Sequence, residues 1–222
     1  SSGGSAVAVQ AGLCHASIGS DTGGSVRQPA AFCGTIGFKP SYGRVSRWGL
    51  LAYASSFDCI GPITKSVSDA ALLLEVMAGA DEHDSTVSKV PVPEYTRHVR
   101  PQKPARIGYL HDTLENEAID EAIRLAMKRL IAQLEQQGHE VKPVEFKLLP
   151  YYLPTYYILT TAEASSNLSR YDGVRYGYRD AHSSDLVQLY KRSRTEGFGA
   201  EVRKRILLGT YVLSASYYDA YY

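Results

Sequence analysis

The chain has 222 residues, of which 44% are hydrophobic, and a formal net charge of +1 at pH 7. This length and apolar content allow one sizeable core, and the balanced charge argues against a basic surface for direct nucleic-acid binding. The sequence has no apolar run long enough to span a bilayer and no signal-peptide pattern. Its three cysteines, Cys14, Cys33 and Cys59, show no C-x-x-C spacing, which favours reduced thiols and a cytoplasmic location.

The first twelve residues are small and rich in serine and glycine. Residues 1–5 read S-S-G-G-S and run without a break into alanines and valines that end at Gly12. An expression linker has a similar composition. Small side chains in this position would equally allow close backbone packing around a site.

A glycine-rich turn follows. Residues 13–19 predict a short buried strand, residues 22–24 a tight connection, and residues 26–32 a helix or helical turn. Unpaired N–H groups at such a turn, assisted by the dipole of the next helix, attract negative charge. If that charge is the oxyanion of an acyl transfer, Ser25 is the nucleophile, and losing one N–H donor costs roughly 3–4 kcal/mol of transition-state stabilisation.

Two other interpretations of the turn stay open. A glycine-rich turn before a helix can bind phosphate, although the Lys-Ser/Thr ending of a P-loop is absent here. The turn can also be purely structural. The esterase motif G-x-S-x-G does not fit, because Arg27 stands where its second glycine would be.

The middle of the chain has the pattern of an α/β protein. Residues 66–69 have capping-box character before a helix over 70–77 that ends at Gly79. Four prolines predict an irregular connection over 88–104. Residues 105–110 and 140–146 predict strands that flank a helix stopped by Gly138, which gives a parallel pair with a right-handed crossover. The apolar face of that helix consists of Ile119, Ile123, Met127, Leu130 and Leu134.

Beyond Pro150 the pattern is helical and rich in tyrosine, which we interpret mainly as packing residues. The chain has no initiating methionine, begins inside a motif and ends on Tyr221 and Tyr222 in a helical pattern. We therefore expect residues 1–222 to be one partial domain, with segments missing at both ends.

These motifs together resemble the amidase signature family, whose hallmark is G-G-S-S-G-G-S followed by D-[TI]-G-G-S-[IV]-R. Ser1 and Ser25 are 24 positions apart (25 − 1), the family's spacing, and only the first pattern is cut, at Ser1. Residues 32–34, 37–40, 41–44 and 58–62 also match. The resemblance implies an α/β fold with a mixed central sheet flanked by helices on both faces.

The resemblance also implies a Ser–cis-Ser–Lys triad. By position, Ser25 is the acyl-forming nucleophile and Ser1 the bridging serine on a cis peptide. The backbone at Thr22, Gly23, Gly24 and Ser25 corresponds to the oxyanion hole. In the family the catalytic lysine lies upstream of the bridging serine, and therefore outside this chain, so we expect the 222-residue chain alone to be inactive.

The last third of the chain points to one branch of that family. Residues 162–177, 197–211 and 213–222 resemble the glutaminase (A) subunits of the tRNA-dependent amidotransferases. There an arginine that corresponds to Arg205 binds the carboxylate of glutamine, which suits its planar fork, and a tyrosine near Tyr156 lines the pocket. On residue pattern alone, Arg205 would be a solvated helix charge beside Arg203 and Lys204.

The reaction that this branch implies is hydrolysis of glutamine through a glutamyl ester on Ser25. The ammonia passes to a partner B subunit, which uses ATP and Mg²⁺ to convert Glu-tRNA(Gln) to Gln-tRNA(Gln), while a small C subunit completes a heterotrimer. We expect the glutaminase subunit itself to bind no metal or cofactor. Two alternatives are a free-standing amidase of the same family and a nucleotide-binding or structural module.

Overall fold

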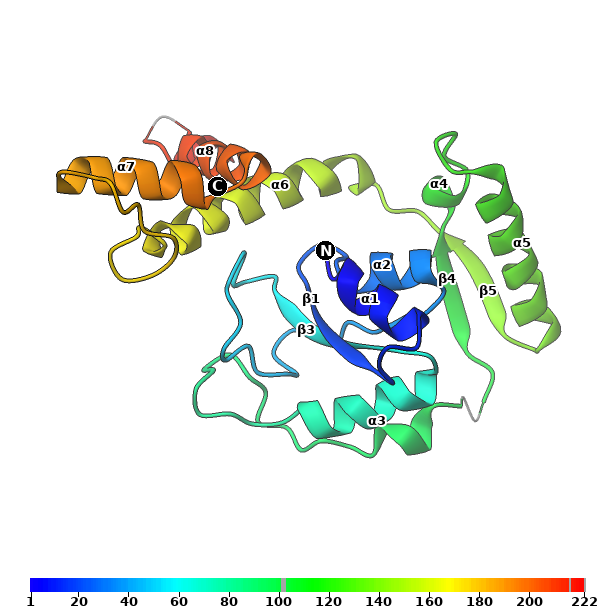
Figure 1. The fold of residues 1–222 in the computed structure, drawn as a ribbon. Coiled ribbons are helices and arrows are strands. Elements are labelled where there is room, and N and C mark those ends of the chain that lie inside the picture. The colour runs from blue at the N-terminus through cyan, green and yellow to red at the C-terminus, as the bar shows by residue number, and fades with distance from the viewer. Residues whose placement is uncertain (101–102, 216, 222) are drawn as a thin grey trace. The chain divides into compact units, whose positions relative to one another are not determined.

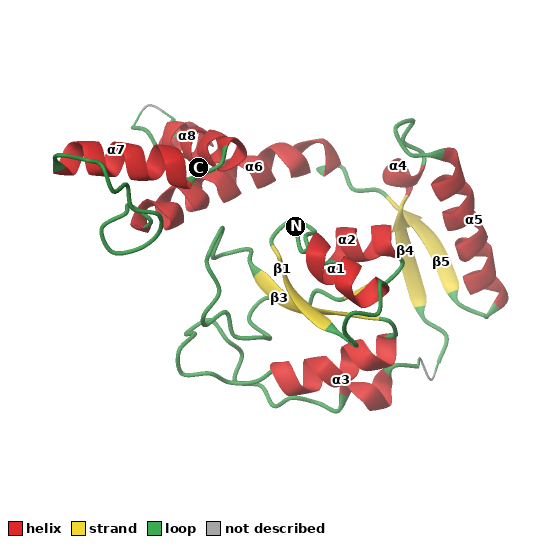
Figure 2. Cartoon of the chain, in the orientation of Figure 1, coloured by secondary structure: helices red, strands yellow, loops and turns green. Residues whose placement is uncertain are grey.

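The computed structural model describes residues 1–100, 103–215 and 217–221, with the backbone alone for residues 220 and 221. The chain divides into two compact units, which are described separately (Figure 1, Figure 2). The first consists of Ser1–Thr96 and Pro154–Tyr222, and the second of Arg97–Leu153.

The first unit contains a three-stranded antiparallel sheet. Its strands β1 (Ser17–Asp21), β3 (Cys59–Thr64) and β2 (Ile36–Gly37) lie in the order β1-β3-β2. Helices α1 (Gly3–Gln10) and α2 (Arg27–Cys33) pack on each other and on the sheet, and α3 (Val67–Met77) packs on β3 and β2. The buried core between α1, α2 and the sheet consists of Ala6, Val9, Val26, Ala30 and Ile63.

The local predictions for this unit are confirmed except at the first strand. The strand predicted at 13–19 begins only at Ser17, and Leu13 is 79% exposed. The reason is the end of α1. Gly12 has φ +74° and the N–H of Leu13 donates to the Ala8 carbonyl at 2.9 Å, so residues 11–13 cap that helix and cannot pair as strand.

Helix α3 begins and ends as its sequence predicts. The Ser66 hydroxyl accepts from the Asp69 N–H at 3.1 Å, and Gly79 follows the helix with φ +133°. The predicted irregular connection over 88–104 includes residues 101 and 102, which lie outside the described residues; its described part is irregular apart from one 3₁₀ turn, Tyr95–His98. The chain in this region therefore follows local capping and proline signals.

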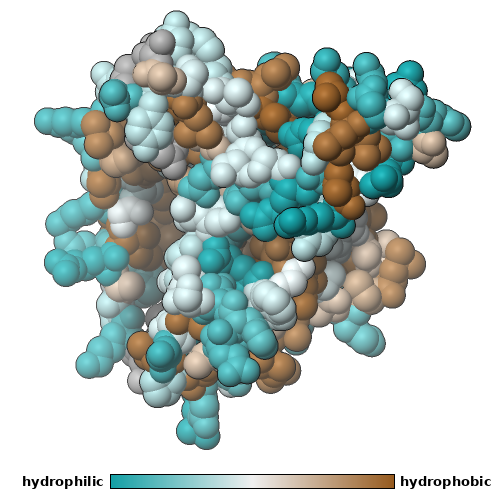
Figure 3. Space-filling model, turned by 90° about the vertical axis from the view of Figure 1, so that its left-hand side faces the viewer, coloured by the Kyte–Doolittle hydropathy of each residue, from teal (hydrophilic) through white to brown (hydrophobic). Residues whose placement is uncertain are grey.

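The tyrosine-rich part of the chain is helical. It forms α6 (Leu149–Asn167), the 3₁₀ turn Leu168–Arg170, α7 (Leu186–Gly197), α8 (Ala200–Val212) and α9 (Tyr218–Tyr221). Exposed apolar residues here include Leu186, Val187 and Leu207. On the face of the molecule in Figure 3, hydrophobic side chains form patches that hydrophilic ones interrupt.

The second unit has the predicted strand–helix–strand arrangement. Strands β4 (Arg106–Leu110) and β5 (Glu140–Val144) are parallel, with Arg106 opposite Glu140, and α4 (His111–Leu114) and α5 (Glu121–Gln136) lie between them in sequence. Helix α5 begins after the Asp120 cap, so Ile119 lies outside it. Gly138 has φ +87°. The α/β class is confirmed, but among the described residues the expected mixed pairing occurs in two separate sheets, because β4 and β5 pair only with each other.

Close contact between α6 and α8 depends on a glycine. A Cβ atom at Gly209 would lie 1.9 Å from the Thr161 carbonyl oxygen and 2.8 Å from Cβ of Ser165. Next to this contact the hydroxyls of Ser165 and Thr210 are hydrogen-bonded at 2.9 Å. The two helices therefore touch backbone to backbone at this point.

We expect Gly209→Ala to destabilise the protein by about 1–3 kcal/mol, because the added methyl group must push α8 away from α6. Denaturation of the full-length protein measures the loss. Gly199→Ala is the matched control, since Gly199 has φ −64° and no atom within 4 Å of its Cβ position. Equal stability of the two variants would contradict the close packing.

Candidate active site

The glycine-rich turn joins β1 to α2 and carries Ser25 just before that helix. Gly24 has φ +128°, a conformation that glycine adopts without strain. Its N–H donates to Asp21, whereas the N–H groups of Thr22, Gly23 and Ser25 have no hydrogen-bond partner among the described residues. Of the four residues whose backbone is expected to form the oxyanion hole, Gly24 therefore has its N–H bonded to a buried carboxylate.

Asp21 shapes this turn. Its side chain is fully buried, and its carboxylate accepts from the N–H groups of Gly24 at 2.8 Å, Val26 at 3.2 Å and Arg27 at 3.3 Å. The Arg27 guanidinium contacts both carboxylate oxygens, at 3.0 and 2.9 Å. Burial alone raises the pKa of Asp21, but the hydrogen bonds from Arg27 and the backbone outweigh burial and lower it.

The second residue of the chain, Ser2, lies beside Ser25. The N–H of Ser2 donates to the Ser25 carbonyl at 2.9 Å, and the Ser2 hydroxyl accepts from the Ser20 N–H at 3.2 Å. The hydroxyls of Ser1 and Ser25 are not hydrogen-bonded to each other in the described part of the chain. Every peptide bond between described residues is trans, so the cis peptide expected at Ser1 is not found on the Ser1–Ser2 bond.

Tyr156 of α6 lies against the turn. A Cβ atom at Gly23 would come within 2.6 Å of the Tyr156 ring and hydroxyl, so only glycine leaves room for the ring there. Burial is the main cause of a raised pKa of Tyr156, and the neighbouring Tyr53 adds to it. The structure thus brings the predicted pocket residue Tyr156 to the predicted oxyanion turn.

Arg205 of α8 belongs to the same cluster of side chains. Its Nε donates to Glu201 at 2.9 Å and its Nη1 donates to the Tyr53 hydroxyl at 2.9 Å. The guanidinium carbon lies 5.7 Å from the centre of the Tyr53 ring and 5.8 Å from that of Tyr157, which packs edge-on against Tyr156. The hydrogen bonds to Tyr53 and Glu201 raise the pKa of Arg205, so the side chain stays charged.

Sequence reasoning did not single out Tyr53 or Asp58, although residues 58–62 were among the matched motifs. The buried Asp58 carboxylate accepts from the Tyr53 N–H at 2.9 Å and from the Thr22 hydroxyl. The Tyr53 carbonyl accepts from Asn167 of α6 at 3.2 Å. Asp58 therefore links the glycine-rich turn to the loop at Tyr53, which contacts Arg205. No local sequence pattern predicts this connection.

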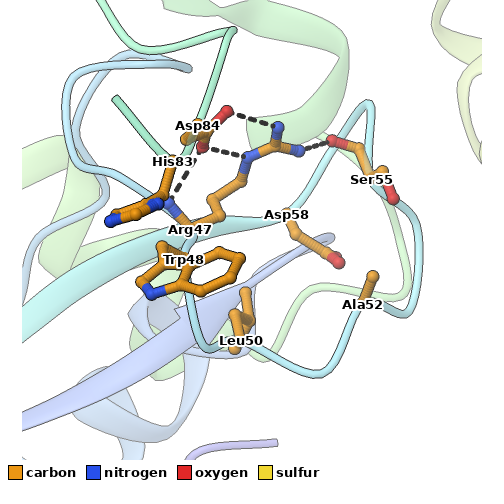
Figure 4. Close-up of a pocket in the computed structure, with 8 residues that line it drawn as sticks. All are labelled: Arg47, Trp48, Leu50, Ala52, Ser55, Asp58, His83 and Asp84. Carbon is orange, nitrogen blue, oxygen red and sulfur yellow. Dashed lines mark hydrogen bonds and ion pairs between the residues drawn. The ribbon is translucent and has the colours of Figure 1, made fainter. Parts of the chain in front are cut away.

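A neighbouring polar pocket holds this loop in place (Figure 4). The Arg47 guanidinium lies between Asp84, at 3.1 Å, and the Ser55 carbonyl. The hydrogen bond to Arg47 is the main cause that holds the pKa of Asp84 well below its usual range. Because Arg47 is bonded to Asp84 and to the Ser55 carbonyl, the residues of this pocket support the loop.

The described residues contain no group of three or more His, Cys, Asp or Glu side chains arranged to hold a metal ion. Within the same residues, every helix is too short or too polar to cross a membrane.

The chain belongs to the amidase family, whose sequence profile, described as Amidase, matches residues 1–222. The A subunit of the glutamyl-tRNA(Gln) amidotransferase of Acaryochloris marina is 53% identical over the whole chain, and that of Methylacidiphilum infernorum is 55% identical. The chain covers 46% and 45% of these two relatives, so it spans less than half their length.

Solved structures agree with this assignment. The A subunit of the glutamyl-tRNA(Gln) amidotransferase of Thermotoga maritima is 39% identical, with a TM-score of 0.69 over 100% of this chain and 43% of its own. The peptide amidase of Stenotrophomonas maltophilia is 30% identical, with a TM-score of 0.75 over 96% of this chain and 44% of its own. The amidase fold expected from the sequence is therefore confirmed.

We expect Asp21→Asn to lower the free energy of unfolding by about 1–3 kcal/mol near neutral pH, because a buried, multiply bonded acceptor loses its charge. The pKa of Asp21 is lowered in the folded state, so its stabilisation is complete above the unfolded-state pKa of about 3.9 and is lost as the pH falls through the folded-state pKa.

Denaturation of the full-length protein across this pH range tests the assignment. The difference between the wild type and Asp21→Asn should shrink below about pH 4. Asp112→Asn, at an exposed position in α4, serves as the control. A constant difference across the range would contradict the role of the ionised carboxylate.

Proposed function

We propose that the chain is part of the glutaminase subunit of a glutamyl-tRNA(Gln) amidotransferase. The observation that carries this proposal is the position of Tyr156, which contacts both the glycine-rich turn at Gly23 and the aromatic cluster around Arg205. One end of this site can stabilise a developing oxyanion, and the other carries a fixed positive charge. Glutamine has the two matching groups, an amide to be cleaved and an α-carboxylate.

The chemistry begins at Ser25. Its hydroxyl oxygen attacks the side-chain amide carbon of glutamine while its proton is removed, and the carbonyl oxygen becomes an oxyanion. The unpaired N–H groups of Thr22, Gly23 and Ser25 are the available donors for that oxygen. Proton transfer to the nitrogen and cleavage of the C–N bond release ammonia and leave a glutamyl ester, which water hydrolyses to glutamate and free Ser25.

The base for this step is assigned by family correspondence. Ser1 is the bridging hydroxyl, and its neighbour Ser2 is tied to the Ser25 carbonyl. The catalytic lysine is a residue upstream of Ser1. A lysine in that role must work as a free amine, which requires burial to lower its pKa by about three units.

Arg205 is the group that selects the substrate. Its guanidinium keeps two donors engaged with Glu201 and Tyr53, while Nη2 has no partner among the described residues. The planar, permanently charged guanidinium of an arginine binds a carboxylate through two parallel hydrogen bonds, which the ammonium group of a lysine cannot form. The Tyr156 ring lies between this charge and the turn and would line the methylene chain of glutamine.

The same proposal includes the partner subunits of the glutaminase. The ammonia passes to a B subunit that uses ATP and Mg²⁺ to amidate glutamate carried on tRNA(Gln), and a C subunit completes the cytoplasmic heterotrimer. The glutaminase subunit needs no metal or cofactor of its own. The high identity to the glutaminase subunits of A. marina and M. infernorum supports this assignment over that of a free-standing amidase.

Ser25→Ala in the assembled complex should abolish glutamine hydrolysis, because no acyl-enzyme can form. Ammonia release and mass spectrometry of a trapped glutamyl adduct measure the effect. Amidation of Glu-tRNA(Gln) with added ammonium chloride should persist and serves as the control for folding and assembly. Undiminished ammonia release from glutamine, or an adduct at another residue, would reject the nucleophile assignment.

Arg205→Lys should raise KM for glutamine about tenfold or more with little change in kcat. Losing one charge-assisted hydrogen bond costs about 1.5–3 kcal/mol, and the α-carboxylate is remote from the reacting amide. Steady-state glutaminase kinetics of the complex measure both constants. Arg203→Lys, the same change two positions earlier on α8, should behave as the wild type, and equal effects of both variants would contradict the assignment.

A further inference from the structure

The orientation of Arg205 depends on a residue far from it in sequence. Nη1 of Arg205 donates to the Tyr53 hydroxyl at 2.9 Å, and the guanidinium carbon lies 5.7 Å from the centre of the Tyr53 ring. Glu201, one helical turn earlier on α8, accepts from Nε at 2.9 Å. The two acceptors hold the guanidinium from different sides.

Tyr53 is itself held firmly. Its N–H donates to the buried Asp58 at 2.9 Å, and its carbonyl accepts from Asn167 at 3.2 Å. The N–H of the next residue, Ala54, also donates to Asp58, at 3.1 Å. A tyrosine fixed through both main-chain groups offers its hydroxyl at a defined position, whereas Glu201 has a flexible side chain that is 66% exposed.

These contacts also connect Tyr53 to the reacting end of the site. The carboxylate of Asp58 that holds the Tyr53 backbone accepts from the Thr22 hydroxyl as well, and Thr22 belongs to the oxyanion turn. Tyr53 therefore sets the position of the guanidinium with respect to the same anchor that fixes the turn. Ordering a binding group before the ligand arrives reduces the entropy lost on binding.

We propose that Tyr53 is a positioning residue that sets the specificity of this site for an amide carrying an α-carboxylate. The inference rests on the proposed glutaminase function. The Tyr53 hydroxyl holds Arg205 in the orientation in which its remaining N–H groups meet the carboxylate. The Tyr53 ring supports the guanidinium by stacking, a contact that phenylalanine would keep.

The test uses Tyr53→Phe in the assembled complex. KM for glutamine should rise about three- to tenfold with kcat nearly unchanged, because the contact binds the ground state and the transition state alike. For 4-aminobutanamide, which is glutamine without its α-carboxylate, kcat/KM should not change. A merely structural role would lower the kcat/KM of both substrates alike, and that result would overturn the proposal.

Tyr95→Phe is the matched control. The Tyr95 hydroxyl accepts from Nε of Arg44 at 2.7 Å and its ring lies 5.8 Å from that guanidinium carbon, in the connection that follows α3. It repeats the tyrosine–arginine pair outside the proposed site. This variant should keep the wild-type KM for glutamine, and a rise equal to that of Tyr53→Phe would overturn the proposal.

A double-mutant cycle gives a second, independent measurement. In the Arg205→Lys background, Tyr53→Phe should no longer change KM for glutamine, since Tyr53 acts through Arg205. Additive effects would overturn the inference. Ser25→Ala distinguishes this failure from failure of the function: if that variant is inactive while Tyr53→Phe keeps the wild-type KM, the inference alone is wrong.

Discussion

The proposed site depends on one buried carboxylate. Asp21 must satisfy its charge away from water, and it does so by accepting the N–H groups of Gly24, Val26 and Arg27 and the Arg27 side chain. These bonds curl the chain back before α2 and fix which N–H groups stay unpaired. A negative charge under an oxyanion site would normally repel the reacting group. The half-exposed Arg27 side chain offsets the charge of Asp21. The Asp21 carboxylate can therefore fix the conformation of the turn without preventing the turn from binding an oxyanion.

A second buried carboxylate, that of Asp58, connects the glycine-rich turn to Arg205 at the other end of the proposed site. Asp58 accepts from the Thr22 hydroxyl and from the Tyr53 N–H, and the Tyr53 hydroxyl accepts from Arg205. The turn and the guanidinium are therefore positioned by one polar network. The separation between these two groups sets the length of the substrate that can engage both. In the proposed function, the two ends engage the amide and the α-carboxylate of one glutamine molecule.

Sequence patterns predicted the structural features that depend on residues close together in the chain. The Ser66 cap, the stop at Gly138 and the parallel pair β4–β5 each follow from a few adjacent residues, and the structure confirms them. The first strand was misplaced because a helix-capping turn competes with strand pairing at Leu13. Asp21 could have been recognised as a cap, since an aspartate directly before a glycine turn often accepts backbone N–H bonds. The bond between Tyr53 and Arg205 joins residues 152 positions apart, and no periodicity carries that information.

Two adjacent glycines in the turn meet different physical demands. Gly24 has φ +128°, so it allows the backbone to reverse, whereas Gly23 has no positive φ and is needed because the Tyr156 ring fills the space of its side chain. The Gly23–Gly24 dipeptide thus determines both the shape of the turn and the space available to the Tyr156 ring. The half-buried Tyr156 ring lies against the turn at Gly23, next to its unpaired N–H groups. In the proposed function, the ring that would line the apolar stem of glutamine therefore lies beside the N–H groups that would bind the oxyanion, and such hydrogen bonds strengthen as water is excluded.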